Sequence, residues 1–150
     1  MKNKNLFIVL LLLFPYWVWA QSYSVKRLDA IEGLTSNYVL SIAQDKQGFL
    51  WFATEEGLNK FDGLRFTNYR HISADSSSIR NNYVRTLFED SRRNLLVGCI
   101  DGLMKYDRET DSFLEIPMFR AGKRVFPHIT QMQELHNGEI WMTTTGQGMF

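Results

Sequence analysis

Three histidines, His71, His128 and His136, are the side chains of this chain best suited to bind a metal or to transfer protons. Metal-binding histidines usually lie a few residues from one another or from cysteines, whereas these three are far apart in the sequence. No helical pattern surrounds His71, so its context differs from that of a histidine that accepts a phosphoryl group. We therefore interpret the three as loop or strand-edge residues, with His128 at a strand start and His136 in a turn, and we expect no metal site.

Other patterns that could carry catalysis are also weak. Ser76-Ser77-Ser78 follows Asp75, but no Gly-x-Ser-x-Gly elbow is there to present a nucleophile. Gly146-Gln147-Gly148 is too short for a phosphate-binding loop and does not open a helix. The acidic residues that recur at expected turn positions are Glu55, Glu56, Asp62, Glu89 and Asp90. Turn formation explains them better than paired acid–base chemistry, so we expect no catalytic residue, no cofactor and no enzyme in this chain.

The composition narrows the class of protein further. Seventeen Lys and Arg against sixteen Asp and Glu give a net charge of +1. Because a nucleic-acid-binding protein normally has a clustered basic excess, we expect no nucleic acid partner. The apolar fraction of 45% is sufficient for a core, and the 14% of aromatic residues favours strands. The one cysteine, Cys99, cannot form a disulfide within the chain, and we interpret it as a small buried apolar residue.

The first twenty residues have the pattern of a secretory signal peptide. Two lysines precede an apolar run, and Val18-Trp19-Ala20 places a small residue before the expected cleavage site. The run is short for a membrane-spanning helix, which takes about 20 apolar residues, and Pro15 interrupts it. We expect residues 1–20 to be a signal peptide cleaved after Ala20, with an uncleaved anchor as the alternative. The mature chain, residues 21–150, would then be exported.

The sequence repeats with a period of about 45 residues. Trp51 shifted by 45 positions falls on Leu96, and shifted again it falls on Trp141. Other groups keep the same shift: Asn37-Tyr38-Val39 with Asn82-Tyr83-Val84, Asp45 with Asp90, Gly57-Leu58 with Gly102-Leu103, and Lys60-Phe61-Asp62 with Lys105-Tyr106-Asp107. The third copy keeps this register from His128 to Trp141 and then gains one residue. A period of this size is typical of solenoids, propellers or arrays.

Each period contains short apolar runs separated by turn signals. In the first copy we expect strands over residues 38–44, 49–54, 58–61 and 64–69. Asp45 and Gly48 suit a β-turn, Gly57 can adopt a positive φ, and Asp62-Gly63 favours a hairpin. The second run is apolar on both faces, so we expect it to be covered from both sides. No helical periodicity of useful length is present.

Short antiparallel strands of this kind, with inner strands apolar on both faces, predict the blades of a β-propeller. The expected fold class is all-β, an incomplete propeller of two to three blades built from four-stranded antiparallel sheets. We expect residues 21–150 to hold blade 1 over about 37–70, blade 2 over about 82–117 and the start of blade 3 over about 127–150.

The second copy departs from the first at two positions. Leu96 stands where the other copies have tryptophan, which indicates a repacked core. The turn Asp90-Ser91-Arg92-Arg93 ends without a glycine, and the adjacent Asn94 tolerates the left-handed region. Arg92 and Arg93 could form an anion-binding patch, but we interpret them as part of a solvated turn.

These residues resemble the two-component regulator propeller repeat. The likeness is carried by Gly33-Leu34-Thr35-Ser36-Asn37, by Gly48-Phe49-Leu50-Trp51-Phe52-Ala53-Thr54 and by Gly57-Leu58-Asn59-Lys60-Phe61-Asp62-Gly63. It is good in the second copy and recognisable in the third, so that it extends over residues 31–150.

The resemblance implies an N-terminal fragment of the periplasmic sensor region of a hybrid two-component histidine kinase of gut Bacteroidetes. Full-length members carry their propellers outside the inner membrane, cross it once and continue into a kinase. The implied ligand is an oligosaccharide, and the implied output is regulation of polysaccharide utilisation. The implied partners are the remaining propeller blades and the kinase of the full-length protein, and a homodimer is compatible with the resemblance.

The ligand-binding residues are unknown from the sequence. Trp51 and Trp141 could stack on a sugar, but tryptophans that recur in register fit a blade core better. Tyr69 and Phe119 are loop aromatics with no further support. One alternative to a kinase sensor is a stand-alone exported propeller that acts as a binding or scaffold module. Another is a propeller lyase or glycosidase, for which we see no cluster of acidic, histidine or tyrosine residues.

Overall fold

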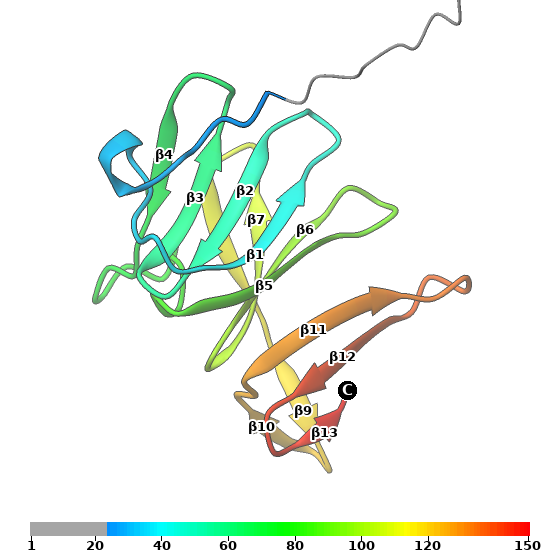
Figure 1. Cartoon of the computed structure of the whole chain (residues 1–150). Coiled ribbons are helices and arrows are strands. Elements are labelled where there is room, and N and C mark those ends of the chain that lie inside the picture. The colour runs from blue at the N-terminus through cyan, green and yellow to red at the C-terminus, as the bar shows by residue number, and fades with distance from the viewer. Residues whose placement is uncertain (1–23) are drawn as a thin grey trace, which may run out of the picture.

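The computed structural model describes residues 24–150, so the predicted signal peptide at residues 1–20 lies outside the described residues. The described part is almost entirely β-structure (Figure 1). Within residues 24–150 the only helical element is a short 3-10 turn, η1 (Ala30–Glu32), which Asp29 caps. None of the helical structure in that range is long and apolar enough to span a membrane.

Three successive antiparallel sheets follow the sequence repeat. The first sheet has the order β1 (Val39–Gln44), β2 (Leu50–Thr54), β3 (Gly57–Phe61) and β4 (Phe66–Tyr69). The second sheet has the order β5 (Val84–Glu89), β6 (Leu95–Cys99), β7 (Gly102–Asp107) and β8 (Ser112–Ile116). The third sheet has the order β11 (Ile129–Glu134), β12 (Ile140–Thr144) and β13 (Gly148–Met149). A hairpin of β9 (Met118–Arg120) and β10 (Lys123–Val125) connects the second and third sheets.

The sheets repeat one local geometry at the predicted spacing. The first strand of each sheet has a break in its pairing register, between Val39 and Ser41, between Val84 and Thr86, and between Ile129 and Gln131. These first strands also contact one another in chain order, β1 with β5 and β5 with β11 (Figure 1). The sequence repeat is therefore confirmed as a structural repeat, and the strands predicted for the first copy lie within two residues of their observed bounds.

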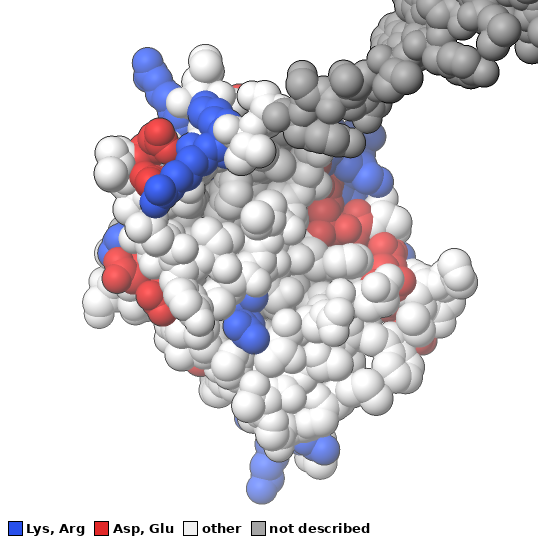
Figure 2. All heavy atoms as spheres, viewed as in Figure 1, with Lys and Arg blue, Asp and Glu red and all other residues white. Residues whose placement is uncertain are grey.

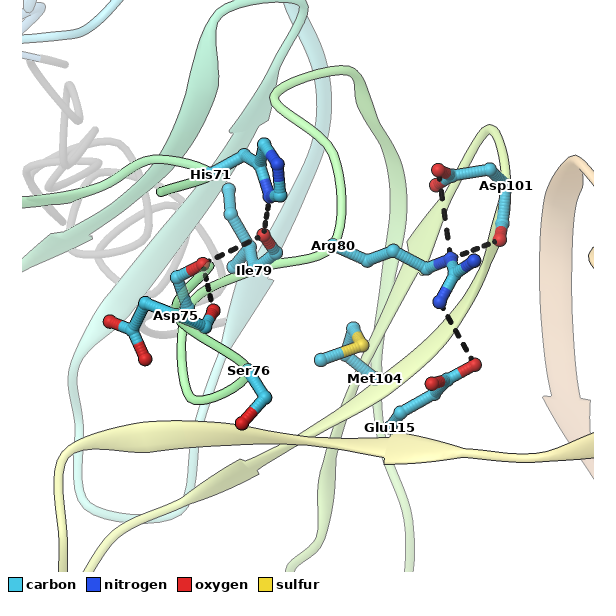
Figure 3. A pocket seen from close by; sticks show the side chains of 9 residues that line it. His71, Asp75, Ser76, Ile79, Arg80, Asp101, Met104 and Glu115 are labelled. Carbon is cyan, nitrogen blue, oxygen red and sulfur yellow. Dashed lines mark hydrogen bonds and ion pairs between the residues drawn. The ribbon is translucent and has the colours of Figure 1, made fainter. Parts of the chain in front are cut away.

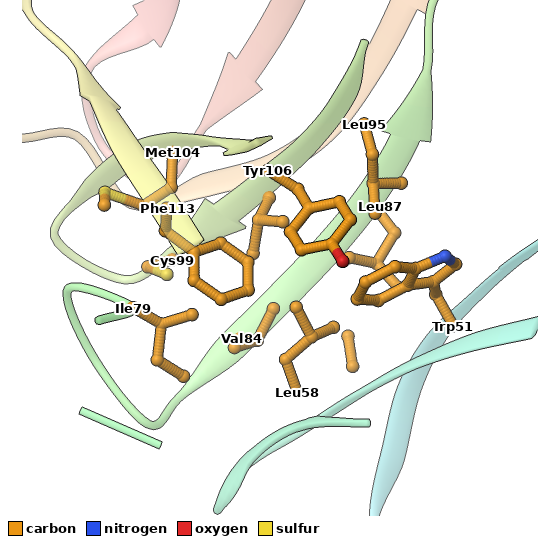
Figure 4. Packing of buried hydrophobic residues seen from close by; sticks show 12 residues of the cluster. Trp51, Leu58, Ile79, Val84, Leu87, Leu95, Cys99, Met104, Tyr106 and Phe113 are labelled. Atoms are coloured by element: carbon orange, nitrogen blue, oxygen red, sulfur yellow. The ribbon is translucent and has the colours of Figure 1, made fainter. Parts of the chain in front are cut away.

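The main core lies between the first and second sheets (Figure 4). Trp51 and Leu58 of the first sheet are fully buried against residues such as Val97 and Tyr106 of the second. The rings of Trp51 and Tyr106 meet edge to face, with centroids 4.7 Å apart. β2 and β6 are buried along both faces, as their sequences predict. Each sheet thus depends on its neighbour to remove apolar surface from water.

A second apolar cluster joins the second and third sheets. Leu96 of β6 packs here with Ile129 and Met132 of β11. Gly98 lies where the two sheets pack closely, because a Cβ at this position would be 3.2 Å from Ile129 Cγ2 of the third sheet and 2.6 Å from Thr86 Cγ2 of its own sheet. The absence of a side chain at Gly98 therefore lets the third sheet pack onto the second.

A buried carboxylate organises the turn of the first sheet. Asp45 Oδ1 accepts hydrogen bonds from the backbone N–H groups of Gln47 and Phe49, each at 3.0 Å. Asp45 Oδ2 accepts one from Trp51 Nε1 at 2.9 Å. Arg108, in the β7–β8 turn of the second sheet, lies 3.4 Å from the same carboxylate, whose side chain is fully buried. The turn, the core tryptophan and the neighbouring sheet are therefore joined at one residue.

The second sheet keeps this turn with a different donor. Leu96 offers no indole N–H, and Asn94 Nδ2 instead donates to Asp90 Oδ2 at 2.7 Å. The left-handed conformation falls on Arg93 itself, with φ of 68°, and not on Asn94. The sequence analysis assigned the left-handed conformation to Asn94, and that assignment was wrong. Both the side-chain amide and the backbone N–H of Asn94 donate to Asp90, which holds Asn94 in place.

Two parts of the described chain differ from the sequence expectation. Leu64 is 88% exposed in the β3–β4 turn, so β4 begins at Phe66 and not at residue 64. The hairpin of β9 and β10 was not predicted, and its Met118 is buried between the second and third sheets. Phe119, expected in a loop, lies in β9 and is 60% exposed.

Gly98→Val should destabilise the protein. The added side chain would collide with Thr86 and Ile129, and overpacking of this kind typically costs about 1–3 kcal/mol in the free energy of unfolding. Urea denaturation followed by circular dichroism measures the change. Glu55→Ala, at an exposed turn, is the control and should stay within about 0.5 kcal/mol of the parent. Equal stability of Gly98→Val and the parent would contradict the close packing of the two sheets.

The Cys99 thiol should be unreactive while the protein is folded. Burial raises the pKa of this thiol to about 12, so the thiolate that attacks disulfide reagents is scarce near neutral pH. We expect labelling by an aromatic disulfide at pH 8 to require unfolding, with fast labelling in denaturant as the control. Rapid labelling of the folded chain would show that β6 is not enclosed between sheets.

Candidate functional site

The candidate site is a hollow of about 390 Å³ beneath the link that runs from β4 to β5 (Figure 3). The link must carry the chain from the last strand of the first sheet to the first strand of the second, and it passes over the end of the second sheet. Link residues on one side of the hollow are His71, Asp75, Ser76, Ser78, Ile79 and Arg80. Asp101, Met104 and Glu115 of the second sheet form the other side.

Arg80 is the central charged residue of the hollow. Its Nε donates to the backbone carbonyl of Asp101 at 2.8 Å and lies 3.6 Å from Asp101 Oδ2. Its Nη1 lies 3.1 Å from Glu115 Oε1 (Figure 3). Arg124 Nη2 lies 2.8 Å from the other carboxylate oxygen, Glu115 Oε2. The planar guanidinium of Arg80 is thus held in one orientation between two carboxylates.

One carboxylate oxygen of Asp101 has no hydrogen-bond partner among residues 24–150. Asp101 Oδ2 is occupied by Arg80 and by Asn81 Nδ2, the latter at 3.4 Å. Asp101 Oδ1 is buried and accepts no hydrogen bond from residues 24–150. A buried acceptor without a donor is costly, and a hydroxyl or amide of a bound molecule could satisfy it.

The link is folded by its own polar side chains. Ser77 Oγ donates to Asp75 Oδ1 at 2.6 Å, and this hydrogen bond is the main reason why the pKa of Asp75 lies below its ordinary value. Ser78 Oγ donates to the carbonyl of Asp75 at 2.8 Å. His71 Nδ1 lies 3.0 Å from the carbonyl of Ile79. The predicted polar loop at Ser76–Ser78 is confirmed, and these contacts account for the hydroxyls of Ser77 and Ser78.

A smaller hollow of about 240 Å³ adjoins the other side of the link, near a pair of tyrosines. The hydroxyls of Tyr69 and Tyr106 each donate to Asp111 Oδ1 at 2.6 Å. Burial raises the pKa of Asp111, but these two donors outweigh it and hold that pKa below its ordinary value. Burial, followed by the contact with Asp111, raises the pKa of Tyr69. The shared carboxylate ties β4 of the first sheet to the second sheet.

The candidate residues that the sequence suggested are distributed over the structure rather than gathered. Among residues 24–150, no three His, Cys, Asp or Glu side chains are grouped as a metal site. His128 precedes β11 and His136 lies in the β11–β12 turn, as predicted, and only His71 borders the hollow.

The aromatic candidates are separated as well. Trp51 is fully buried, so its interpretation as blade core is confirmed. Trp141 occupies the same register in the third sheet but is 45% exposed. Tyr69 is not a loop aromatic: it ends β4, as the strand expected over residues 64–69 predicts, and it stacks on Trp51 at 5.8 Å between centroids.

Sequence reasoning named His71, Asp75 and the serines of the link but missed the three charged residues at the centre of the hollow. Arg80, Asp101 and Glu115 are far apart in the chain and belong to no motif. One signal was available, because the link between the first two copies is long and polar and must cross a sheet end. Long connections in compact domains are often functional.

Comparison with known proteins identifies the repeat. The family model described as two component regulator propeller matches residues 33–56. Over 82 residues the chain is 43% identical to histidine kinase P4 of Formosa agariphila, a match that covers 53% of this chain and 6% of that protein.

Solved structures agree with this match. The extracellular domain of the hybrid two component system BT3049 from B. thetaiotaomicron superimposes with a TM-score of 0.74 and 36% identity, covering 85% of this chain and 18% of that one. The extracellular domain of BT4673 from the same organism has a TM-score of 0.66 and 23% identity, covering 76% of this chain and 16% of that one, a likeness in fold alone. The chain spans less than a fifth of each of these three proteins.

The residues that the family model matches form the structural unit that recurs in the sheets. Residues 33–56 contain the turn in which Asp45 holds Trp51, and the breaks in strand register repeat that unit in the second and third sheets. The sheets are therefore blades of a β-propeller, and the unit at residues 33–56 that they repeat is similar to the two component regulator propeller repeat.

Proposed function

We propose that this chain forms part of the extracellular sensor region of a hybrid two-component histidine kinase. The observation that carries the proposal is the 36% identity to the extracellular domain of such a system, over 85% of this chain. The 43% identity to a histidine kinase supports the same role. A signal peptide at residues 1–20 would deliver the region to the periplasm, where blades over about 37–70, 82–117 and 127–150 would fold.

The proposed ligand is an oligosaccharide, and the proposed output is control of polysaccharide utilisation. The hollow under the β4–β5 link supports a polyhydroxylated ligand, because it is lined by the fixed guanidinium of Arg80, by Asp101 with its unpaired Oδ1 and by polar side chains of the link. A ligand there would touch both the link and the second sheet. It would alter kinase activity only if it bound two packing arrangements of the blades with different affinity.

The coding sequence beyond codon 150 separates the proposal from a stand-alone propeller. We expect the reading frame to continue through further repeats, a membrane-spanning segment and a histidine kinase domain. A frame that ends after further repeats alone would favour an exported binding or scaffold module and would contradict the sensor proposal.

Asp101→Asn should weaken ligand binding. The substitution keeps the shape of the side chain but makes the acceptor neutral. Hydrogen bonds to charged groups are worth about 1.5–3 kcal/mol and neutral ones about 0.5–1.5 kcal/mol, so the difference of about 1–1.5 kcal/mol should lower the affinity by about five- to tenfold. Calorimetric titration of the chain with a panel of neutral and uronic-acid-containing oligosaccharides measures the effect. Glu55→Gln, an exposed turn residue, is the matched control and should bind as the parent does. Binding of no oligosaccharide, or equal binding by Asp101→Asn, would contradict the proposed site.

A further inference from the structure

The hairpin of β9 and β10 concentrates positive charge. Residues 118–126 contain Arg120, Lys123 and Arg124 and no Asp or Glu, whereas the whole chain has a net charge of only +1. All three basic residues are exposed. In Figure 2 basic side chains project at the bottom of the view, where Figure 1 places β9 and β10, and no acidic side chain is visible beside them. The hairpin therefore offers a local excess of positive charge to an anionic molecule.

The two faces of the hairpin differ in what they contact. Met118 pairs with Val125 across the two strands and is buried between the second and third sheets, so this face points inward. Side chains alternate along a strand, so the next pair, Phe119 and Arg124, projects from the opposite face, which we call the outer face. Phe119 is 60% exposed, and the Arg124 side chain is 48% exposed. The outer face therefore presents an aromatic ring next to a guanidinium.

Phe126 extends the outer face toward the hollow. It follows Arg124 by two residues and is 43% exposed. The guanidinium groups of Arg124 and Arg80 lie 5.2 Å and 4.3 Å from the centroid of its ring. Contacts between a cation and the face of an aromatic ring are attractive. The ring of Phe126 is therefore held in position while much of its surface stays open.

The tip of the hairpin is also fixed. Ala121 and Gly122 have φ of 48° and 75°, and positive φ at both central residues is the pattern of a two-residue type I′ turn. Beside this turn, Arg120 Nη1 donates to the carbonyl of Gln147 at 2.6 Å. A surface that already has its binding shape loses less conformational entropy when a ligand docks on it.

We propose that the outer face of the β9–β10 hairpin binds an acidic oligosaccharide. The apolar faces of its sugar rings would pack on Phe119 and Phe126, whose rings supply open apolar area. Its carboxylates would lie beside the basic residues of the hairpin, because a planar guanidinium suits the geometry of a carboxylate. The proposal rests on the proposed function for the ligand being an oligosaccharide, and it adds a site outside the hollow and the negative charge of the sugar.

An acidic sugar fits this surface better than an anionic membrane does. The part that would enter a membrane first is Ala121-Gly122, which has little apolar surface, and basic residues flank it on both sides. Phe119 and Phe126 lie farther from the tip, whereas membrane binding requires the apolar side chains to enter the lipid. An acidic peptide would satisfy the charges but has no sugar ring to cover the phenylalanines, so a peptide serves as the competing ligand in the test.

Calorimetric titration of the chain with hexagalacturonate tests the proposal, with cellohexaose as the neutral sugar and hexaglutamate as the acidic peptide. Lys123→Glu should lower the affinity for hexagalacturonate by about fivefold or more, because it replaces an attraction with a repulsion at the binding face. Arg92→Glu makes the same change of net charge in the exposed β5–β6 turn and should change the affinity by less than about twofold. Phe119→Ala should lower the affinity by about threefold or more, because apolar contact area is lost.

The proposal is overturned if hexagalacturonate does not bind, if Lys123→Glu binds it as the parent does, or if Arg92→Glu weakens binding equally. It is also overturned if hexaglutamate binds as tightly as hexagalacturonate and Phe119→Ala affects neither, which would indicate an acidic protein partner. Cellohexaose binding that Asp101→Asn weakens, together with hexagalacturonate binding that ignores Lys123→Glu, would support the proposed function and contradict the hairpin site. Hexagalacturonate binding that requires Lys123 and Phe119 but ignores Asp101→Asn would support the hairpin site and contradict the hollow.

Discussion

The fold depends on strands that are apolar on both faces. β2 and β6 each bury residues toward two sides, and a single sheet has only its neighbours with which to cover them. Trp51 shows the requirement most clearly, because it is fully buried only where the second sheet lies over it. Trp141 occupies the same register in a sheet whose outer face is open, and nearly half of its surface is exposed. Stacking of consecutive sheets therefore provides the hydrophobic stabilisation, and the contact of Arg108 with Asp45 adds a polar link from the second sheet to the first.

The candidate site follows from the same arrangement. Since each sheet runs from an inner to an outer strand, the chain must return across the sheet ends before the next sheet begins. The link from β4 to β5 makes that return, and the space that it encloses with the second sheet is the hollow around Arg80. Asp101 and Glu115 are brought to Arg80 only by the stacking of the second sheet beneath the link. A site formed by a link and a sheet is suited to sensing, because a bound molecule would contact both parts of a joint.

The sequence predicted the features that recur in each repeat well. It predicted poorly the features that occur once and the contacts between sheets. The strands of the first copy, the turn at Asp45 and the core role of Trp51 followed from alternation, turn residues and register. The hairpin of β9 and β10 could not be predicted in this way, because it occurs in only one of the links. Glu89 was interpreted as a turn residue, whereas its side chain reaches the preceding sheet and accepts a hydrogen bond from the backbone N–H of Lys46. Contacts between sheets depend on how the sheets pack in three dimensions, so a local sequence pattern cannot predict them.

Residue-resolved hydrogen exchange across the parent chain tests the central claim that the sheets protect one another. The account predicts that amides of β6, which has a sheet on either side, exchange more slowly than the equivalent amides of β12, which has a sheet on one side only. The two strands occupy the same repeat position, so intrinsic strand geometry is matched between them. Equal protection of β6 and β12, or stronger protection of β12, would contradict the claim that stacking of neighbouring sheets holds this structure together.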